Sequence, residues 1–436
     1  MPKTVHDPLH GSIRLDGVFL KLADRHEMQR LRQIKQLGLG NFVFPGANHT
    51  RFEHSLGVYH LSGQMAESLK LSDEESDIVR AAGMLHDICH TPFSHTLSEL
   101  AEVRFGLDHM KAARKLINGE IPTYAEKDEE FLRSEPTISE ILEDAGISPR
   151  KVCDLIEYPE SKRSTGDLFS QKAGQSFFKS GNYLHQIIHG PIDSDQMDYL
   201  VRDAHYTGVT HGAIDTERII SMLQVHNDQL VLNKGGATAA EGLMVSRSLM
   251  YTSVYYHETV RIAGSMLNKA IEESKLDMGD IHLMTDCDLM ASLESQGGKT
   301  LKISRDLMNR RLYKKAYVGY VADISEEDSH ILAQYTQYGE RKKLEQEIAD
   351  LADVHISEVT VDIPSESALL SKISIGKTDV SILKDDKVRS ITKMSSIAKA
   401  LQSRDTFRWA ILVSSPKDKT DAVGKAVKKV LNLSTS

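Results

Sequence analysis

Apolar residues recur at every third or fourth position from about residue 24 to residue 275, which is the spacing of a buried helix face. This pattern predicts helices over residues 29–38, 57–69, 77–90, 109–117, 195–204 and 241–274. The first of them ends at a glycine, Gly38, as helices often do. Residues 1–20 combine turn residues with a short alternating segment, so we expect an extended arm there.

The pattern changes after about residue 276. Residues 357–365 (SEVTVDIPS) and 408–416 (RWAILVSSP) are typical of short strands, and residues 421–431 form an amphipathic closing helix. We therefore predict a mostly α fold, with a helical domain and its arm over residues 1–275. Residues 276–436 would form a smaller α+β region that serves an interface or regulation.

The composition, with 40% hydrophobic and 26% charged residues, is that of a globular protein. The apolar runs are too short to span a membrane, and the N-terminus lacks the apolar stretch of a secretory signal. Three scattered cysteines suit neither a disulfide framework nor a C-x-x-C zinc site, so we expect a cytoplasmic, reducing location. The net charge of −9 argues against nucleic acid as a partner but not against an anionic small molecule.

The segment MLHDICHTPFSH (84–95) places His86, Asp87 and His90 in a mostly apolar stretch. Burying a carboxylate beside imidazoles is costly unless a cation lies among them. His54 and Asp195, on two other predicted helices, offer two more ligands, and this set suits a divalent ion such as Fe, Mn or Zn. A single helical histidine is more often an ordinary core residue, but the order H…HD…D favours a metal site.

Three motifs, VFPGANHTRFEHSLGVYHL, MLHDICHTPFSH and IDSDQMDYLVRDAHYTG, resemble those of the HD-domain phosphohydrolases. Within that family the chain is most similar to the deoxynucleoside triphosphate triphosphohydrolases, including the enzyme with an added SAM domain, although we expect no SAM domain here. The resemblance is dense over residues 1–275 and thin beyond. It implies a helical HD-domain core.

The resemblance also implies roles for residues around the metal. It assigns the metal ligands to His54, His86, Asp87 and Asp195. It assigns catalytic roles to His90 at the phosphate next to the ribose, His95 near the scissile bond, and His109. The chain departs from the family at two places: Ser98 stands where an acid often assists the catalytic histidine, and Gln196 stands where a lysine follows the last metal aspartate.

The substrate residues that the resemblance implies are Gln36 and Leu37 at the deoxyribose, Asp203 at the 3′-hydroxyl, Arg51 and Arg247 at the triphosphate, and Tyr199 and Tyr255 in the nucleotide pocket. Mg²⁺ would accompany the substrate phosphates. The residues themselves support part of this assignment, because Arg247, Tyr251 and Tyr255 are spaced along one helix face. The alternative is an ordinary amphipathic stripe of core aromatics.

A second nucleotide site is implied by the arm and first helix. The regulated members of the family bind guanine nucleotide at positions that match Lys3, Asp24, Gln29 and Arg32. Such a site needs a neighbouring chain, so the resemblance implies a homo-oligomer, a dimer or tetramer, with GTP or a dNTP as activator. Each residue taken singly is typical of a solvated surface.

The predicted function is metal-dependent hydrolysis of deoxynucleoside triphosphates to deoxynucleoside and triphosphate, with activation by a guanine nucleotide. One alternative is an HD phosphohydrolase acting on another phosphoester, such as a nucleoside monophosphate, cyclic nucleotide or alarmone. Another is a nucleotide sensor without turnover. The preferred base and the native metal stay open.

Overall fold

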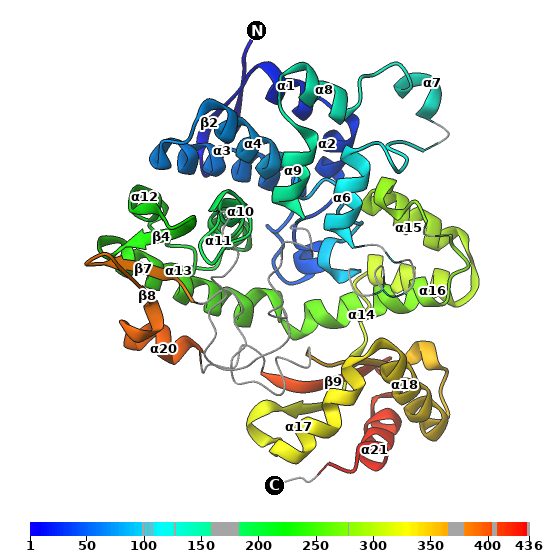
Figure 1. Cartoon of the computed structure of the whole chain (residues 1–436). Coiled ribbons are helices and arrows are strands. Elements are labelled where there is room, and N and C mark those ends of the chain that lie inside the picture. The colour runs from blue at the N-terminus through cyan, green and yellow to red at the C-terminus, as the bar shows by residue number, and fades with distance from the viewer. Residues whose placement is uncertain are drawn as a thin grey trace.

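The computed structural model describes residues 1–97, 100, 103, 106, 108–125, 128–157, 183–277, 279–364, 379–402 and 408–433, apart from the side chains of His95 and Gln402. It is mostly helical, as predicted, with a few small sheets (Figure 1). The helices of the larger body are α1 (Gly17–Ala23), α2 (His26–Arg30), α3 (Arg51–Leu69), α4 (Asp73–Leu85), α6 (His109–Ile117), α7 (Glu129–Leu132), α8 (Ile138–Asp144), α9 (Pro149–Ile156), α10 (Tyr183–Ile188), α11 (Ser194–Thr207), α12 (Thr216–Ser221), α13 (Ala237–Met250) and α14 (Glu258–Glu272).

Local signals explain where the three central helices begin. Thr50 and Glu53 form a reciprocal capping box at the start of α3, and Ser72 and Glu75 form another at the start of α4. Asp193 caps α11 by accepting from the backbone N–H of Gln196. α3 packs against both α4 and α11, so residues from all three helices meet at one place in the core.

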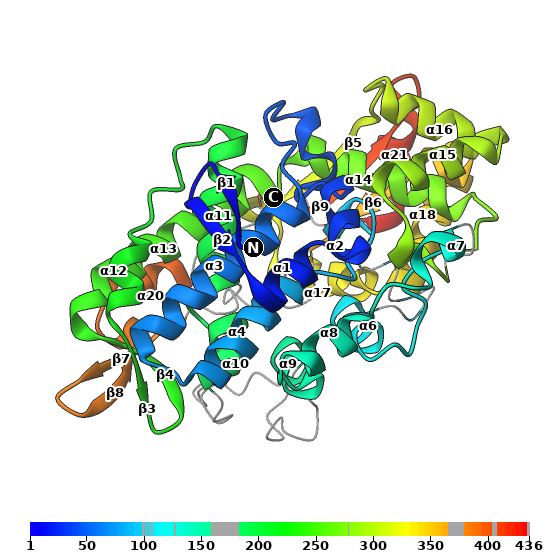
Figure 2. The same cartoon turned by 90° about the horizontal axis from the view of Figure 1, so that it is seen from above.

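Three sheets accompany the helices. The arm is an antiparallel hairpin of β1 (Lys3–Asp7) and β2 (Gly11–Leu15), which lies beside α3 and α11 (Figure 2). A four-stranded sheet has the order β3 (Leu223–His226), β4 (Gln229–Asn233), β7 (Ser381–Lys384) and β8 (Lys387–Ser390). A three-stranded sheet has the order β5 (Lys314–Tyr320), β9 (Trp409–Ser415) and β6 (Thr360–Asp362).

The strands and helix predicted near the C-terminus are confirmed as β6, β9 and α21 (Thr420–Leu431). They pack with α17 (Glu326–Ala333) and α18 (Tyr338–Ala352) around a separate apolar core. α15 (Asp286–Ser295) and α16 (Gly298–Met308) pack near α14 around a second core.

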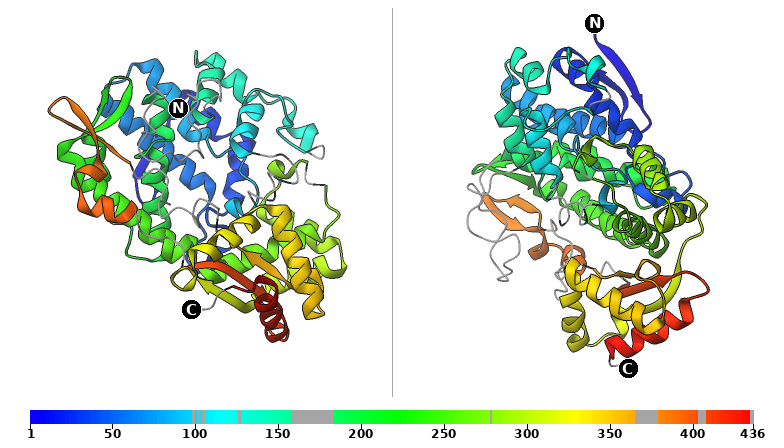
Figure 3. Two further views of the ribbon diagram at one scale, coloured as in Figure 1. Left: turned by 60° about the horizontal axis from the view of Figure 1, so that its bottom comes forward. Right: turned by 90° about the vertical axis from the view of Figure 1, so that its right-hand side faces the viewer.

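The segment 379–402 belongs to neither of those two cores. β7 pairs in parallel with β4, and α20 (Ser396–Gln402) packs on α13. Val380, Ile382, Ile391 and Ala398 are buried in the same core as α3 and α4. Figure 3 accordingly shows the orange strands beside green elements and away from β9 and α21. The division at residue 275 stays a prediction, and this segment returns to the helical side of it.

Three predicted helices end early or are interrupted. Residues 29–38 are helical only through Arg30 and a short 3₁₀ turn (31–33), because the backbones of Ile34 and Gln36 bond to Arg51 and His49 instead. Residues 241–274 are interrupted by a π turn at Tyr251–Tyr255 before α14 begins. Such turns are frequent at functional sites.

The third early end lies in the predicted helix 77–90. α4 ends at Leu85, and residues 86–89 form turns. Arg30 donates to the carbonyls of Ile88 and His90, which the helix no longer satisfies. Because the helix ends at Leu85, the side chains of His86 and Asp87 can both face the interior, where they are buried.

Candidate metal centre and nucleotide cavity

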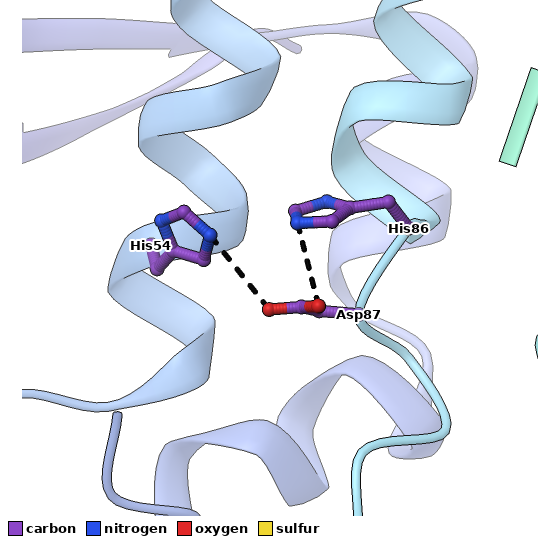
Figure 4. Close-up of side chains that lie close together, drawn as sticks. All are labelled: His54, His86 and Asp87. Carbon is purple, nitrogen blue, oxygen red and sulfur yellow. Dashed lines mark ion pairs between the residues drawn. The ribbon is translucent and has the colours of Figure 1, made fainter. Parts of the chain in front are cut away.

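Four ligand atoms converge where α3, α4 and α11 meet. Asp195 Oδ1 lies 3.1 Å from His54 Nε2 and 3.8 Å from His86 Nε2. Asp87 Oδ1 lies 3.4 Å from His86 Nε2, and Asp87 Oδ2 lies 3.7 Å from His54 Nε2. Figure 4 shows the Asp87 carboxylate facing both imidazoles. The structure thus brings together the four predicted metal ligands.

The two imidazoles are oriented by bonds on their outer nitrogens. His54 Nδ1 donates to Asp198 Oδ2 over 2.8 Å, and His86 Nδ1 donates to the Gly83 carbonyl over 2.9 Å. Both Nε2 atoms therefore face the centre, where a metal ion would displace the proton that Asp195 stabilises on His54 Nε2. Within the described part of the chain, buried His86 Nε2 has no hydrogen-bond partner. Two imidazole nitrogens and two carboxylates suit a divalent transition metal, so these residues fit such an ion.

The charges at this centre attract a cation. Burial lowers the pKa of His54, but hydrogen bonds to Asp195 and Asp198 raise it to about 10. Burial raises the pKa of Asp87, but Arg51 and two neighbouring histidines hold it well below its usual range. Arg51 Nη1 donates to Asp87 Oδ2 over 2.5 Å. The Asp87 carboxylate is therefore ionised at neutral pH.

Three residues of this cluster, His86, Asp87 and Asp195, line a cavity of about 600 Å³. The predicted site residues that line this cavity are Gln36, Leu37, Arg51, His86, Asp87, His90, His109, Asp195, Tyr199, Asp203, Arg247 and Tyr255. The cavity continues between α14 and α18, past Lys269 and Glu345. Residues more than 200 positions apart in the sequence thus meet in one polar cavity.

Two arginines offer unused donors to this cavity. Among the described residues, Arg51 Nη2 and Arg247 Nε find no hydrogen-bond partner although both are buried. Arg247 also donates through Nη1 to Gln196 Oε1 over 3.0 Å, and its guanidinium lies 5.5 Å from the centre of the Tyr251 ring. Arg51 keeps this free donor beside its bond to Asp87, and a buried guanidinium with a donor to spare is suited to the oxygens of a phosphate.

Asp203 is held between two other side chains. Its Oδ2 accepts from the Tyr255 hydroxyl over 2.7 Å, and its Oδ1 contacts His49 Nε2 at 2.8 Å. The His49 ring stacks on Tyr206 with ring centres 4.5 Å apart. Each carboxylate oxygen keeps a second lone pair, which a ligand hydroxyl could use. His49 was not predicted to act in the site, although it lies within the motif VFPGANHTRFEHSLGVYHL.

His90 and His109 form a stacked pair beside the metal cluster, with ring centres 4.6 Å apart. Burial lowers the pKa of both imidazoles below the ordinary histidine value. The pair is therefore neutral near pH 7, and each ring can accept or donate a proton. The side chain of His95 and all of Ser98 lie outside the described residues.

The four predicted allosteric residues form two surface pairs. Lys3 Nζ bonds to Asp24 Oδ2 over 2.9 Å, and both side chains are more than half exposed. Arg32 Nε donates to Gln29 Oε1 over 2.8 Å, and its guanidinium covers the Phe52 ring. The structure places all four near the hairpin and α2.

A second layer of charged residues behind His54 was also not predicted. Asp198 and Arg202 are fully buried and bond to each other on α11, and His10 of the hairpin bonds to Asp198. The signal in the sequence was an i, i+4 Asp–Arg pair on a helix of mixed polar and apolar residues. Such a pair is more often a solvated surface contact.

Within the described part of the chain, no helix is long and apolar enough to cross a membrane.

Two family descriptions match the chain: the HD domain over residues 51–203 and the HD associated region over residues 214–436. An uncharacterized protein of Methanocaldococcus jannaschii is 30% identical over 426 residues, which cover 96% of this chain and 80% of that protein. The deoxynucleoside triphosphate triphosphohydrolase SAMHD1 of Homo sapiens is 29% identical over 335 residues, which cover 72% of this chain and 49% of that enzyme. The chain thus spans about half the length of that enzyme.

Solved structures show the same fold. A hypothetical protein from Aquifex aeolicus matches with a TM-score of 0.67 and 25% identity, covering 98% of this chain and all of that one. A phosphohydrolase from Bacteroides thetaiotaomicron matches with a TM-score of 0.68 and 24% identity, over 96% of this chain and all of that one. Because the HD-domain match covers the metal cluster and the second match covers residues 214–436, the chain belongs to the HD-domain phosphohydrolases that carry an HD associated region.

Proposed function

We propose that the chain is a metal-dependent deoxynucleoside triphosphate triphosphohydrolase, which releases a deoxynucleoside and intact triphosphate. The observation that carries this proposal is one cavity lined by three of the four predicted metal ligands, His86, Asp87 and Asp195, and by two arginines with unused donors. The similarity to the human deoxynucleoside triphosphate triphosphohydrolase supports the substrate class.

His54, His86, Asp87 and Asp195 would hold the ion. A divalent transition metal (Fe, Mn or Zn) bound there lowers the pKa of water and polarises a phosphoryl oxygen. The Asp198 and Gly83 bonds to the outer nitrogens keep both imidazoles in the tautomer that binds metal.

The arginines would bind the phosphate tail. Arg51 Nη2 and Arg247 Nε are buried donors with no partner among the described residues, and leaving them unpaired costs stability until an anion arrives. With His90, and with Mg²⁺ on the phosphates, they would stabilise charge as it moves toward the leaving oxygen.

Protonation of the leaving 5′-oxygen would fall to His109 or His95. A histidine with a pKa near or below neutrality can take a proton from water and return it to the leaving group. The stack of His109 on His90 holds the first of these rings beside the phosphate-binding side of the cavity.

The sugar would be read by Asp203, Gln36 and Leu37, with Tyr199 and Tyr255 as pocket walls. Asp203 is fixed by Tyr255 and His49 with lone pairs to spare for a 3′-hydroxyl. Gln36 Oε1 is buried and finds no partner among the described residues, and Leu37 lies beside it on the cavity wall. A close apolar wall at this point would exclude a 2′-hydroxyl.

Regulation belongs to the same proposal. Lys3, Asp24, Gln29 and Arg32 would bind a guanine nucleotide between subunits of a homo-oligomer, with the charged side chains on phosphates and the amide on the base. The exposed Lys3–Asp24 ion pair and the contact of Arg32 with Gln29 support this assignment.

A second candidate, hydrolysis of another phosphoester, rests on Gln196. The amide at this position accepts from Arg247 and donates to the Gly190 carbonyl and Asp193, so it adds no positive charge to the phosphate side. A substrate with fewer phosphates would need fewer cations. A nucleotide sensor without turnover is the third candidate, and the complete ligand cluster argues against it.

The test is product analysis of the purified chain with a panel of dNTPs, NTPs, monophosphates and cyclic nucleotides, in Mn²⁺ or Fe²⁺, with and without GTP. We expect deoxynucleoside and triphosphate from dNTPs, and none from His86→Ala or Asp87→Ala. Turnover of only a non-dNTP phosphoester would move the assignment to the second candidate. Binding without turnover would move it to the sensor.

A further inference from the structure

The turn of the N-terminal hairpin is connected to the metal cluster through two buried side chains. Asp7 Oδ1 accepts from the backbone N–H groups of Leu9 and His10 over 2.9 and 3.0 Å, which fixes the turn. Asp7 Oδ2 accepts from Arg202 Nη1 over 2.8 Å. His10 Nε2 donates to Asp198 Oδ1 over 2.7 Å. The hairpin thus places two side chains on α11, from almost 200 positions away in the sequence.

Asp198 accepts as many hydrogen bonds as a carboxylate can. Its Oδ1 accepts from His10 Nε2 and Arg202 Nη2, and its Oδ2 accepts from Arg202 Nε and His54 Nδ1, all over 2.7 to 2.9 Å. An ionised carboxylate offers about four lone-pair sites. The carboxylate cannot rotate without breaking several of these bonds, so the His54 imidazole is held in one orientation.

The packing of α3 on α11 supports the same conclusion independently. A Cβ atom at Gly57, one turn after His54, would lie 1.9 Å from Asp198 Oδ1 and 2.6 Å from Arg202 Nη2. The two helices therefore approach closely at a residue without a side chain. That approach is what brings Asp198 under His54.

We propose that His10 and Asp7 are positioning residues for the metal ligand His54, acting through Asp198 and Arg202. This inference rests on the proposed metal site and extends it to the N-terminal hairpin. The hairpin then helps to orient the metal ligand. Without its contacts the Asp198 carboxylate could rotate, and the His54 imidazole would no longer be held in the orientation that binds metal.

The expected size of the effect follows from other metal sites. Residues that orient a metal ligand typically contribute 10- to 100-fold, as an order of magnitude, to metal affinity. His10 acts through one intermediate residue, so we expect His10→Ala to weaken Mn²⁺ binding by about 10-fold.

The experiment compares variants of the full chain by Mn²⁺ titration calorimetry, metal content after dialysis, and thermal unfolding without metal. His10→Gln is the conservative variant, because its amide nitrogen can replace His10 Nε2 as the donor to Asp198. His6→Ala is the matched control, an exposed histidine on the same hairpin whose ring bonds to the Ser12 hydroxyl.

We expect His10→Ala to lose Mn²⁺ affinity while its metal-free unfolding temperature stays near that of the parent, and His10→Gln to recover the affinity. Asp7→Asn removes the charge that pairs with Arg202, so it should also lower the affinity for Mn²⁺. Parental Mn²⁺ affinity in His10→Ala, or equal losses in His10→Ala and His6→Ala, would overturn the proposal. If the parent chain binds Mn²⁺ in this way but hydrolyses no dNTP, the proposed function fails and the positioning role stands.

Discussion

Asp195 and Asp198 lie less than one turn apart on α11, yet their surroundings suit them to different tasks. The oxygens of Asp198 are occupied by four donors from the protein, so none is left for a metal. Asp195 instead places Oδ1 between the Nε2 atoms of His54 and His86. The fully buried Asp198 therefore orients the metal ligand His54, and the partly exposed Asp195 would itself bind the metal.

Arg247 is expected to act on substrate and not on the metal. Its described contacts are with Gln196 and Tyr251, and it does not touch the metal cluster. Arg247→Ala should lower kcat/KM for dNTPs by about 100-fold, since a hydrogen bond to a charged group contributes about 2–3 kcal/mol. Steady-state kinetics with Mn²⁺ affinity measured in parallel checks this.

The control for that experiment is Arg14→Ala, which removes an exposed arginine paired with Asp16. It should leave kcat/KM unchanged. A loss of Mn²⁺ affinity in Arg247→Ala equal to its loss of kcat/KM would contradict a role at the phosphates.

At the scale of elements, α3 has to reconcile helix stability with close packing. Glycine within a helix usually costs about 0.5–1 kcal/mol relative to alanine. α3 accepts that cost at Gly57, where a Cβ would collide with Asp198, and at Gly63, where a Cβ would meet only Arg80 at an ordinary 3.5 Å. Substitution of these two glycines by alanine is therefore expected to change the free energy of unfolding in opposite directions.

Gly57→Ala is expected to destabilise the protein by about 2 kcal/mol or more, because it overpacks a buried ion pair. Gly63→Ala in the same helix should be neutral or stabilise by up to about 1 kcal/mol. Urea unfolding of both variants measures the two free energies. Equal changes in the two variants would show that the close approach of α3 and α11 is not needed.

A histidine between two elements predicts a pH effect on stability. His282, in the 3₁₀ turn Ile281–Leu283, is buried and donates through Nε2 to the Pro122 carbonyl over 2.9 Å. Burial lowers the pKa of His282 below 6.5. The unfolded chain then binds more protons than the folded chain, so this residue lowers stability as the pH falls through about 6.5.

His282→Gln keeps the donor but removes the titration. Its free energy of unfolding should fall less steeply between pH 7 and pH 5 than that of the parent, as urea unfolding at several pH values would reveal. His330→Gln, at an exposed position on α17, is the control and should follow the parent. Identical slopes for His282→Gln and the parent would refute the assignment.

Helices and strands could be predicted from the sequence where the spacing of hydrophobic residues and the local start and stop signals indicate the same element. α3, α11 and β9 follow their local signals. The helix predicted over residues 29–38 fails because tertiary hydrogen bonds from Gln36 to His49 outcompete a helical pattern. The metal ligands could be predicted because the residue types of the H…HD…D order indicate metal binding. The roles of His10 and His49 could not, since each depends on a carboxylate about 150 or more positions away.

At the scale of the whole molecule, the chain crosses between its two parts more than once. The HD body continues through α14 into the cores of α15 to α18, and residues 379–402 then return to pair with β4. Lys269 on α14 bonds to Glu345 on α18 over 2.6 Å, and both side chains are buried. The cavity runs between these helices, so both parts of the chain line it.

A fragment of residues 1–275 is therefore expected to be unstable. It would leave the edge of β4 unpaired and expose the core surface that Val380, Ile382 and Ile391 cover. Size-exclusion chromatography and thermal unfolding should show aggregation or a markedly lower unfolding temperature than for the full chain. A monomeric fragment with the unfolding temperature of the full chain would contradict this account.

The most direct test of the proposed chemistry is hydrolysis of a dNTP in H₂¹⁸O with Mn²⁺ or Fe²⁺, followed by mass spectrometry of the products. Attack of water on the phosphorus nearest the ribose predicts one ¹⁸O in the triphosphate and none in the deoxynucleoside. Labelled pyrophosphate with a nucleoside monophosphate, labelled orthophosphate, or label in the deoxynucleoside would contradict it.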